Sequence, residues 1–344
     1  MKHFFIPFSL LCLLTIACQP ETQTQSDAQV SAEAPKTVGE IEQNSPALTQ
    51  WVSPQAQMEV LSEGHVWTEG PVWVPEIQSV LFSDIPPNSI FQWKEGEGSK
   101  LYLKPSGYTG TVERGGEGGS NGLLLDKDGS LILCQHGDRR VAKMVAPLSE
   151  PSAKFVSVVK GWEGKRFNSP NDAAFHPNGM LYFTDPPYGL EKRMEDPNKE
   201  IDFQGVYRVD ASGEVHLLTD QLTRPNGIAF SPEGDIAYVA NSDPERAIWM
   251  AYEVNEAGDF ENGKVFFDAT SMTADKKGLP DGLKVNAQGI LFATGPGGVL
   301  IFTPEGEHLG TLFTGQATSN CAFGEDEKTL YITADMYLLR IALL

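Results

Sequence analysis

The chain has 344 residues, enough for one large domain or two ordinary ones. It carries 46 Asp and Glu against 26 Lys and Arg, a formal net charge of −20, and has no long run of Lys and Arg, so the charge pattern of a nucleic-acid-binding protein is missing. Its 34 Gly and 23 Pro imply many turns and, with 18 Phe and 9 Tyr, favour short strands over long helices. We therefore expect an acidic, strand-rich protein that binds no nucleic acid.

The first 18 residues have the pattern of an export signal. Lys2 and His3 precede an apolar run over residues 4–16, the arrangement of a secretory signal, and this run is too short for a membrane-spanning helix of about 20 residues. The run ends in Leu-Thr-Ile-Ala-Cys at Cys18, which resembles the lipobox of bacterial lipoproteins, although Thr15 stands where that motif prefers Leu. We expect an exported lipoprotein of the bacterial periplasm or cell envelope, anchored through Cys18. An ordinary signal peptide with an incidental cysteine is the alternative.

Residues 19–50 are rich in Gln, Glu, Ser, Thr and Ala and contain almost no large apolar side chain. A segment of this composition cannot bury enough apolar surface to fold. We predict a disordered polar tether over residues 19–50 and a folded domain over residues 51–344.

From residue 51 onward, short apolar segments alternate with turns rich in Gly, Pro, Asn and Asp, which is typical of an all-β fold. In one recurring unit, a carboxylate or carboxamide residue precedes a short apolar strand, a turn and a second strand. The unit appears at intervals of roughly 40–55 residues, the period of propeller blades, with its polar residue at Glu69, Asn121, Asn171, Asn226, Asp281 and Asn320. The sequence thus predicts a six-bladed β-propeller with four antiparallel strands per blade.

The last unit is short and supplies three strands after Asn320. The missing fourth strand is predicted at residues 58–61, near the start of the folded domain. Closing the ring with strands from both ends of the domain leaves no unpaired sheet edge between the first and last blades.

The six repeated polar residues predict a site at one mouth of the central channel, because the first strand of each blade lines that channel. Asn-Gly and Asp-Gly are also common turn formers, which is the local alternative. The set offers carboxylate and carboxamide oxygens but no His or Cys, and such ligands suit a hard cation. Calcium is the expected ion, because it accepts six to eight oxygens in flexible geometry, whereas Mg²⁺ demands a stricter octahedron.

Several motifs around these residues occur in a specific order and spacing: Glu69-Gly-Pro-Val-Trp, Ser120-Asn-Gly-Leu, His136-Gly-Asp-Arg-Arg, Ser169-Pro-Asn-Asp, Thr184-Asp-Pro-Pro-Tyr-Gly, Arg224-Pro-Asn-Gly and Pro280-Asp-Gly. In this order the chain, from about residue 58 to its end, resembles the gluconolactonase and regucalcin (senescence marker protein) family of six-bladed propellers. The His-Gly-Asp-Arg-Arg and Asp-Pro-Pro-Tyr-Gly segments resemble its bacterial gluconolactonase branch most.

The resemblance implies roles for individual residues. It places metal ligands at Glu69, Asn226 and Asp281, with Asn171 as a ligand or a substrate contact, and it makes Asp281 the first candidate for the general base. Mn²⁺ and Zn²⁺ join Mg²⁺ as alternatives to Ca²⁺, since related proteins use them.

Further site residues follow from their positions. His136 and Asp185 both end strands that run out from the channel, which makes them alternative bases, although His136 is equally well explained as a hydrogen-bonded structural histidine. Asn121 and Tyr188 are expected to contact substrate hydroxyls.

The predicted function is therefore a metal-dependent lactonase that opens a sugar lactone such as gluconolactone. The cation polarises the carbonyl and a nearby carboxylate activates water. The alternatives are a hydrolase for another lactone, ester or phosphotriester, or a non-enzymatic envelope propeller that binds a protein or sugar. We expect a monomer or weak dimer that meets the membrane only through its lipid anchor.

Overall fold

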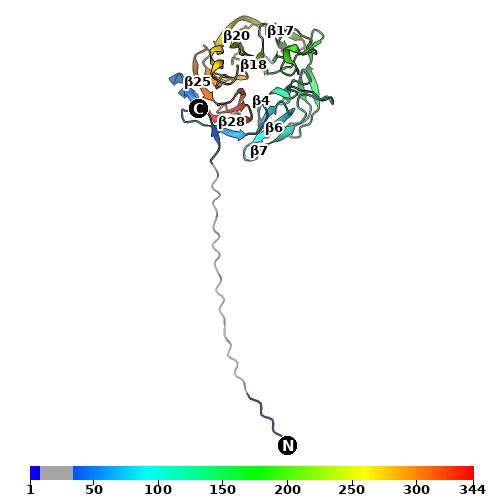
Figure 1. The fold of residues 1–344 in the computed structure, drawn as a ribbon, viewed down its shortest axis with the longest axis vertical. Helices are drawn as coiled ribbons and strands as arrows, with labels where there is room; N and C mark the ends of the chain where they lie inside the picture. Colours follow the sequence, from blue (N-terminus) through cyan, green and yellow to red (C-terminus); the bar gives the residue numbers. More distant parts are fainter. Residues whose placement is uncertain (8–33) are drawn as a thin grey trace. The chain divides into compact units, whose positions relative to one another are not determined.

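Six antiparallel sheets are arranged in a ring in the computed structural model, which describes residues 1–7 and 34–344 (Figure 1). Residues Pro35–Leu344 form one compact unit. The predicted lipobox at Cys18 lies outside the described residues. The prediction of an all-β, six-bladed propeller with four antiparallel strands per blade is confirmed.

Each blade is an antiparallel meander, and in blades 1–5 the four strands follow one another in space as they do along the chain. Blade 1 contains β4 (Thr68–Val74), β5 (Ser79–Asp84), β6 (Ser89–Lys94) and β7 (Gly98–Leu103). Blade 2 contains β8 (Ser120–Leu125), β9 (Leu131–Gln135), β10 (Arg140–Met144) and β11 (Phe155–Val159). Blade 3 contains β14 (Ala173–Phe175), β15 (Leu181–Asp185), β16 (Gly205–Val209) and β17 (Val215–Thr219).

The second half of the ring repeats this order. Blade 4 contains β18 (Pro225–Phe230), β19 (Ile236–Asp243), β20 (Arg246–Val254) and β21 (Phe260–Asp268). Blade 5 contains β22 (Leu283–Val285), β23 (Leu291–Gly295), β24 (Gly298–Phe302) and β25 (His308–Phe313). Blade 6 contains β26 (Thr318–Phe323), β27 (Thr329–Ala334), β28 (Tyr337–Ala342) and, from the other end of the domain, β3 (Met58–Ser62).

Smaller elements fill the connections. A two-stranded ribbon, β12 (Gly161–Trp162) with β13 (Lys165–Arg166), follows blade 2. The 3₁₀-helices are η1 (Pro46–Gln50), η2 (Pro75–Ile77), η3 (Arg193–Glu195) and η4 (Thr270–Ala274). Within the described ranges, no helix has the length and apolar character needed to cross a membrane.

The second strands of the blades are largely buried: every residue of β5, β9, β15 and β23 is buried. β24 is also buried throughout, and after its first glycine it is a continuous apolar run rather than an alternating one. Neighbouring blades meet through aromatic side chains, as where Trp73 of blade 1 stacks on Tyr331 of blade 6 with ring centroids 6.0 Å apart. This packing holds each blade rigidly against the next.

The predicted closure of the ring is confirmed. β3 pairs antiparallel with β28, with Val60 opposite Leu339 and Glu59 opposite Arg340. An ion pair between Arg340 Nε and Glu59 Oε2, at 2.6 Å, supports this register. The last blade therefore carries strands from both ends of the domain.

The predicted tether is wrong for its last part. β1 (Thr37–Val38) pairs with β3 of blade 6, and β2 (Glu40–Gln43) pairs with β25 of blade 5, so both become fifth strands at the outer edges of these blades. η1 follows and buries Leu48. Composition misses this segment because β1 and β2 form backbone hydrogen bonds to unpaired outer edges, which polar residues make as well as apolar ones, and because its few apolar side chains, such as Ile41 and Leu48, all pack on one core cluster.

Candidate functional site

The first strands of the six blades, β4, β8, β14, β18, β22 and β26, contact one another in a closed circuit around the channel. Glu69, Asn121, Asn226 and Asn320 lie near the start of their strands, whereas Asn171 and Asp281 lie two residues before theirs. All except the partly exposed Asp281 are buried. The spacing argument thus places the six residues correctly at the inner strands.

Side chains at the ends of second strands hold the segments that carry these residues. Asp84 Oδ1 accepts the N–H of Trp67 at 3.0 Å, two residues before Glu69. The same device appears in blade 4, where Asn241 Oδ1 accepts the N–H of Arg224 at 2.8 Å. Rigid placement of this kind is what a preorganised site requires.

Asp185 plays this part in blade 3. Its two oxygens accept the N–H groups of Asn168 and Ser169, both at 2.7 Å, just ahead of Asn171. Asp185 does not line the cavity described below, and burial raises the pKa of its carboxyl to about 7. The structure therefore places Asp185 as a positioning residue for Asn171 and not as the base that reaches a substrate.

A cavity of about 450 Å³ opens at the channel mouth. Five of the six repeated residues line it: Glu69, Asn121, Asn171, Asn226 and Asp281. Asn320 is the exception, because its Oδ1 accepts the N–H of Cys321 at 2.9 Å and lies 3.4 Å from Lys284 Nζ. Tyr188, predicted as a substrate contact, also lines the cavity.

The oxygens around this cavity suit a hard cation. The Oδ1 atoms of Asn121, Asn171 and Asp281 are buried and accept no hydrogen bond within the described structure. Asn226 donates from Nδ2 to Ser242 Oγ at 2.9 Å, so its amide oxygen is the atom left for a ligand. Buried acceptors without partners are costly and rare, and a bound cation would satisfy them together.

Without such a cation, the negative charges of the carboxylates at this site are disfavoured by burial and by mutual repulsion. Burial raises the pKa of the Glu69 carboxyl to about 8, and the charge of Asp172 adds to this shift. Burial also raises the pKa of Asp281 well above its ordinary value, with the charge of Glu69 as the next cause. Buried carboxylates that share a site repel each other, and a divalent cation reverses that effect.

Asp172 is a buried acidic residue whose charge acts on Glu69 and Asp281, and the sequence reasoning did not single it out. Its Oδ1 accepts the N–H of Ala173 at 2.9 Å, and its buried Oδ2 has no partner in the described structure. Burial raises the pKa of this carboxyl as well. The available signal was the residue that follows Asn171: Asp172 stands where the other five units have Gly or Cys.

His136 lies behind the cavity and not in its lining. Its Nε2 is 3.5 Å from Asn171 Nδ2, and its Nδ1 is 3.6 Å from Glu117 Oε2. Burial lowers the pKa of His136 to about 3, and the positive charge of Arg114 acts in the same direction. A neutral, fully buried imidazole of this kind favours the structural alternative: it orients Asn171.

Two further cavity residues, Glu117 and Arg193, were not predicted. Glu117 lies on the loop between β7 and β8, and Arg193 begins η3 on the loop between β15 and β16. Their charged groups are 3.8 Å apart. The signal for Glu117 is its setting between two Gly-Gly pairs directly before the Ser-Asn-Gly motif, which marks a tightly packed loop.

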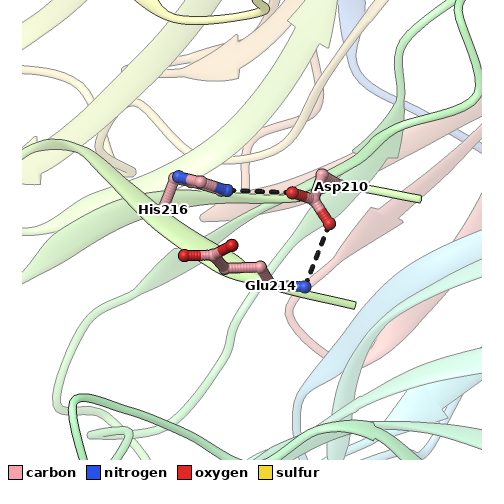
Figure 2. A group of neighbouring side chains, drawn as sticks. All are labelled: Asp210, Glu214 and His216. Carbon is pink, nitrogen blue, oxygen red and sulfur yellow. Dashed lines mark hydrogen bonds and ion pairs between the residues drawn. The ribbon is translucent and has the colours of Figure 1, made fainter. Parts of the chain in front are cut away.

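A second acidic group lies away from the channel on the turn between β16 and β17, where Figure 2 shows Asp210, Glu214 and His216 together. Asp210 Oδ2 is 3.1 Å from His216 Nε2, and Asp210 Oδ1 accepts the N–H of Ser212 at 2.8 Å and of Glu214 at 3.0 Å. These bonds close a turn and leave Asp210 with partners for both oxygens. The channel mouth is therefore the stronger candidate site.

Comparison with known proteins identifies the family of this chain. The family model described as "SMP-30/Gluconolactonase/LRE-like region" matches residues 67–335. A gluconolactonase from Zymomonas mobilis is 39% identical over 311 residues, 89% of this chain and 86% of that protein. Regucalcin from Sus scrofa is 25% identical over 288 residues, 80% of this chain and 85% of that protein. A solved gluconolactonase from Xanthomonas campestris is 27% identical with a TM-score of 0.76, covering 91% of this chain and 99% of that one. This chain belongs to the SMP-30/gluconolactonase/LRE-like family.

Proposed function

We propose that this protein is a metal-dependent hydrolase that opens a sugar lactone, with its cation held by Glu69, Asn171, Asn226 and Asp281. The family and the 39% identical gluconolactonase support a gluconolactonase-like lactone hydrolase. The metal dependence is supported by the convergence of buried oxygens without hydrogen-bond partners on a single cavity. A bound cation there would supply Lewis-acid polarisation of the lactone carbonyl.

Calcium is the proposed ion. The four proposed ligands are two carboxylates and two carboxamides, without the imidazole or thiolate that zinc sites normally include. Two carboxylates neutralise a divalent charge and leave coordination positions for water and substrate. The flexible coordination number of calcium suits ligands drawn from four different blades.

The chain's own groups account for the remaining chemistry. In lactone hydrolysis the oxygen of water bonds to the carbonyl carbon, the ring C–O bond breaks, and the ring oxygen receives a proton to give a hydroxy acid. We assign Asp281 as the base that takes the proton from water and returns it to the ring oxygen. Burial, with the charge of Asp281, raises the pKa of the Tyr188 phenol, so Tyr188 remains a hydrogen-bond donor to the substrate, as does the Asn121 amide.

The test is lactone opening by purified protein, followed as acid release from fresh D-glucono-1,5-lactone. We expect calcium-dependent turnover that chelation with EDTA abolishes and added calcium restores. Turnover that survives complete metal removal would contradict metal dependence. A panel of alkyl lactones, aryl esters and phosphotriesters separates a sugar lactonase from another hydrolase. If the protein hydrolyses no substrate but calcium still raises its melting temperature, the non-enzymatic binding propeller is favoured.

We also propose that the protein is exported and lipid-anchored, on the sequence pattern that ends at Cys18. The full-length chain should partition with membranes and be released from them by detergent. Replacing Cys18 with Ser should move the protein to the soluble fraction. Membrane association that survives Cys18→Ser would contradict the anchor.

A further inference from the structure

Two loops that are far apart along the chain bring charged side chains to the cavity. The β7–β8 loop carries Glu117 and the β15–β16 loop carries Arg193, and both side chains line the cavity with the proposed metal ligands. Their separation of 3.8 Å is longer than a direct hydrogen bond. In the described structure no other group hydrogen-bonds to either side chain, so the carboxylate keeps its acceptor sites and the guanidinium its donors.

Glu117 is held in place by close backbone packing. Gly119 N donates to Ile85 O at 3.0 Å, and a Cβ on Gly119 would lie 2.4 Å from that same oxygen. A Cβ on Gly137 would lie 2.5 Å from Gly118 O, so the loop also fits tightly against the next turn. Burial raises the pKa of Glu117 to about 7, and 27% of the side chain remains exposed at the cavity.

Arg193 is placed by an unusual backbone. Its φ of 49° lies in the left-handed region, which non-glycine residues adopt rarely and which occurs preferentially at functional sites. The guanidinium lies 5.8 Å from the ring centroid of Tyr188, another cavity residue. The Arg193 side chain lines the rim of the cavity and remains 63% exposed, so its guanidinium is open to a ligand that enters from solvent.

The paired charges indicate what they bind. A carboxylate that accepts and a guanidinium that donates complement neighbouring hydroxyl groups, which do both. Because the two charges cancel, the pair does not favour a charged substituent. An alkyl substrate would cover the partly buried Glu117 without giving it a hydrogen-bond partner, and sites built around hydrogen bonds strongly reject analogues that lack them.

We propose that Glu117 and Arg193 bind hydroxyl groups of the substrate and thereby select polyhydroxylated lactones over alkyl lactones. This inference rests on the proposed lactonase function and adds to it the residues that determine specificity. It assigns them a role in recognition, separate from the water activation assigned to Asp281.

The test compares Glu117→Gln and Arg193→Met on two ring-matched substrates, D-glucono-1,5-lactone and δ-valerolactone. Each variant should lower kcat/KM for gluconolactone by roughly tenfold or more, mainly through KM, and leave δ-valerolactone within about threefold of wild type. Glu113→Gln and Lys192→Met are the matched controls, because these exposed residues lie on the same two loops outside this cavity. Both controls should keep the wild-type preference.

A binding assay separates failure of this inference from failure of the proposed function. D-glucono-1,5-lactam and δ-valerolactam are stable analogues whose binding calorimetry can measure without turnover. Wild type should prefer the hydroxylated lactam, and Glu117→Gln and Arg193→Met should lose that preference. If wild type hydrolyses neither lactone, the proposed function is overturned and lactam binding alone decides the inference. Variants that keep the wild-type preference overturn the inference.

Discussion

This protein has two groups of acidic side chains that differ in their hydrogen bonding and in the direction of their pKa shifts. At the channel mouth, Glu69 and Asp281 are packed with carboxamides whose buried oxygens lack partners. At the β16–β17 turn, Asp210 already has hydrogen-bond partners for both oxygens and lies at the surface with Glu214 and His216 (Figure 2).

The pKa shifts of the two groups run in opposite directions. Burial raises the pKa of Glu69 and of Asp281, whereas hydrogen bonds from Ser212 and His216 lower the pKa of Asp210. The first group is unsatisfied until something binds, and the second is satisfied by its own turn. A functional site is therefore indicated by unmet bonding capacity, not by a count of acidic residues.

The largest expected difference is in catalysis. Asp281→Asn keeps the shape of the side chain but removes the base, so kcat should fall by about 10²–10⁴-fold, the usual contribution of a general base. Asp210→Asn should leave kcat within about twofold. The measurement is acid release from gluconolactone by both variants side by side, and similar losses in the two would erase the distinction between the groups.

Metal binding should separate the two groups next. Calcium at about 100 times its Kd should stabilise the wild type by about 2.7 kcal/mol, because it binds only the folded state. Glu69→Gln removes one of the two proposed carboxylate ligands and should abolish most of the calcium-induced rise in Tm, whereas His216→Gln should retain it. Thermal unfolding with and without calcium checks this, and a calcium response lost only in His216→Gln would move the metal site to the β16–β17 turn.

The smallest expected effect is the pH dependence of stability without metal. The pKa of Glu69 is about 8 in the folded protein and ordinary in the unfolded chain. The contribution of its protonated form to the free energy of unfolding is therefore fully present below about pH 4.5 and is lost as the pH rises toward 8. Asp281 acts in the same direction. Glu69→Gln should flatten this slope in chelated protein. Urea unfolding at pH 5, 6, 7 and 8 measures it, and an unchanged slope would contradict the shift.

Asp210 provides the opposite sign for comparison. Its pKa is lowered on folding, so its contribution is present above its ordinary pKa and is lost as the pH falls through the folded value. Asp210→Asn should therefore lower the free energy of unfolding by a constant amount between pH 5 and 8, leave the slope in that range as in wild type, and lose its effect in acid. A changed slope between pH 5 and 8 would show that Asp210 is coupled to groups beyond its turn.

Much of the fold and part of the site could be predicted because they repeat. A unit that recurs six times averages out local ambiguity, so the blade count, the closing strand at Met58–Ser62 and the inner position of Glu69 or Asn226 all followed from spacing. The N-terminal boundary could not be predicted in this way. β1 and β2 are held by backbone pairing to edges that exist only once blades 5 and 6 have formed.

Residue roles at the site divide along the same line. The sequence by itself determined which inner-strand positions carry carboxylate or carboxamide side chains, because strand period and turn chemistry are local properties. Only the tertiary structure decided that Asp185 binds backbone N–H groups, that His136 is buried and neutral behind Asn171, and that Glu117 meets Arg193. These roles depend on burial and on contacts between distant loops. Burial changes the pKa and the hydrogen-bonding needs of a side chain, so two residues of the same type can have different roles.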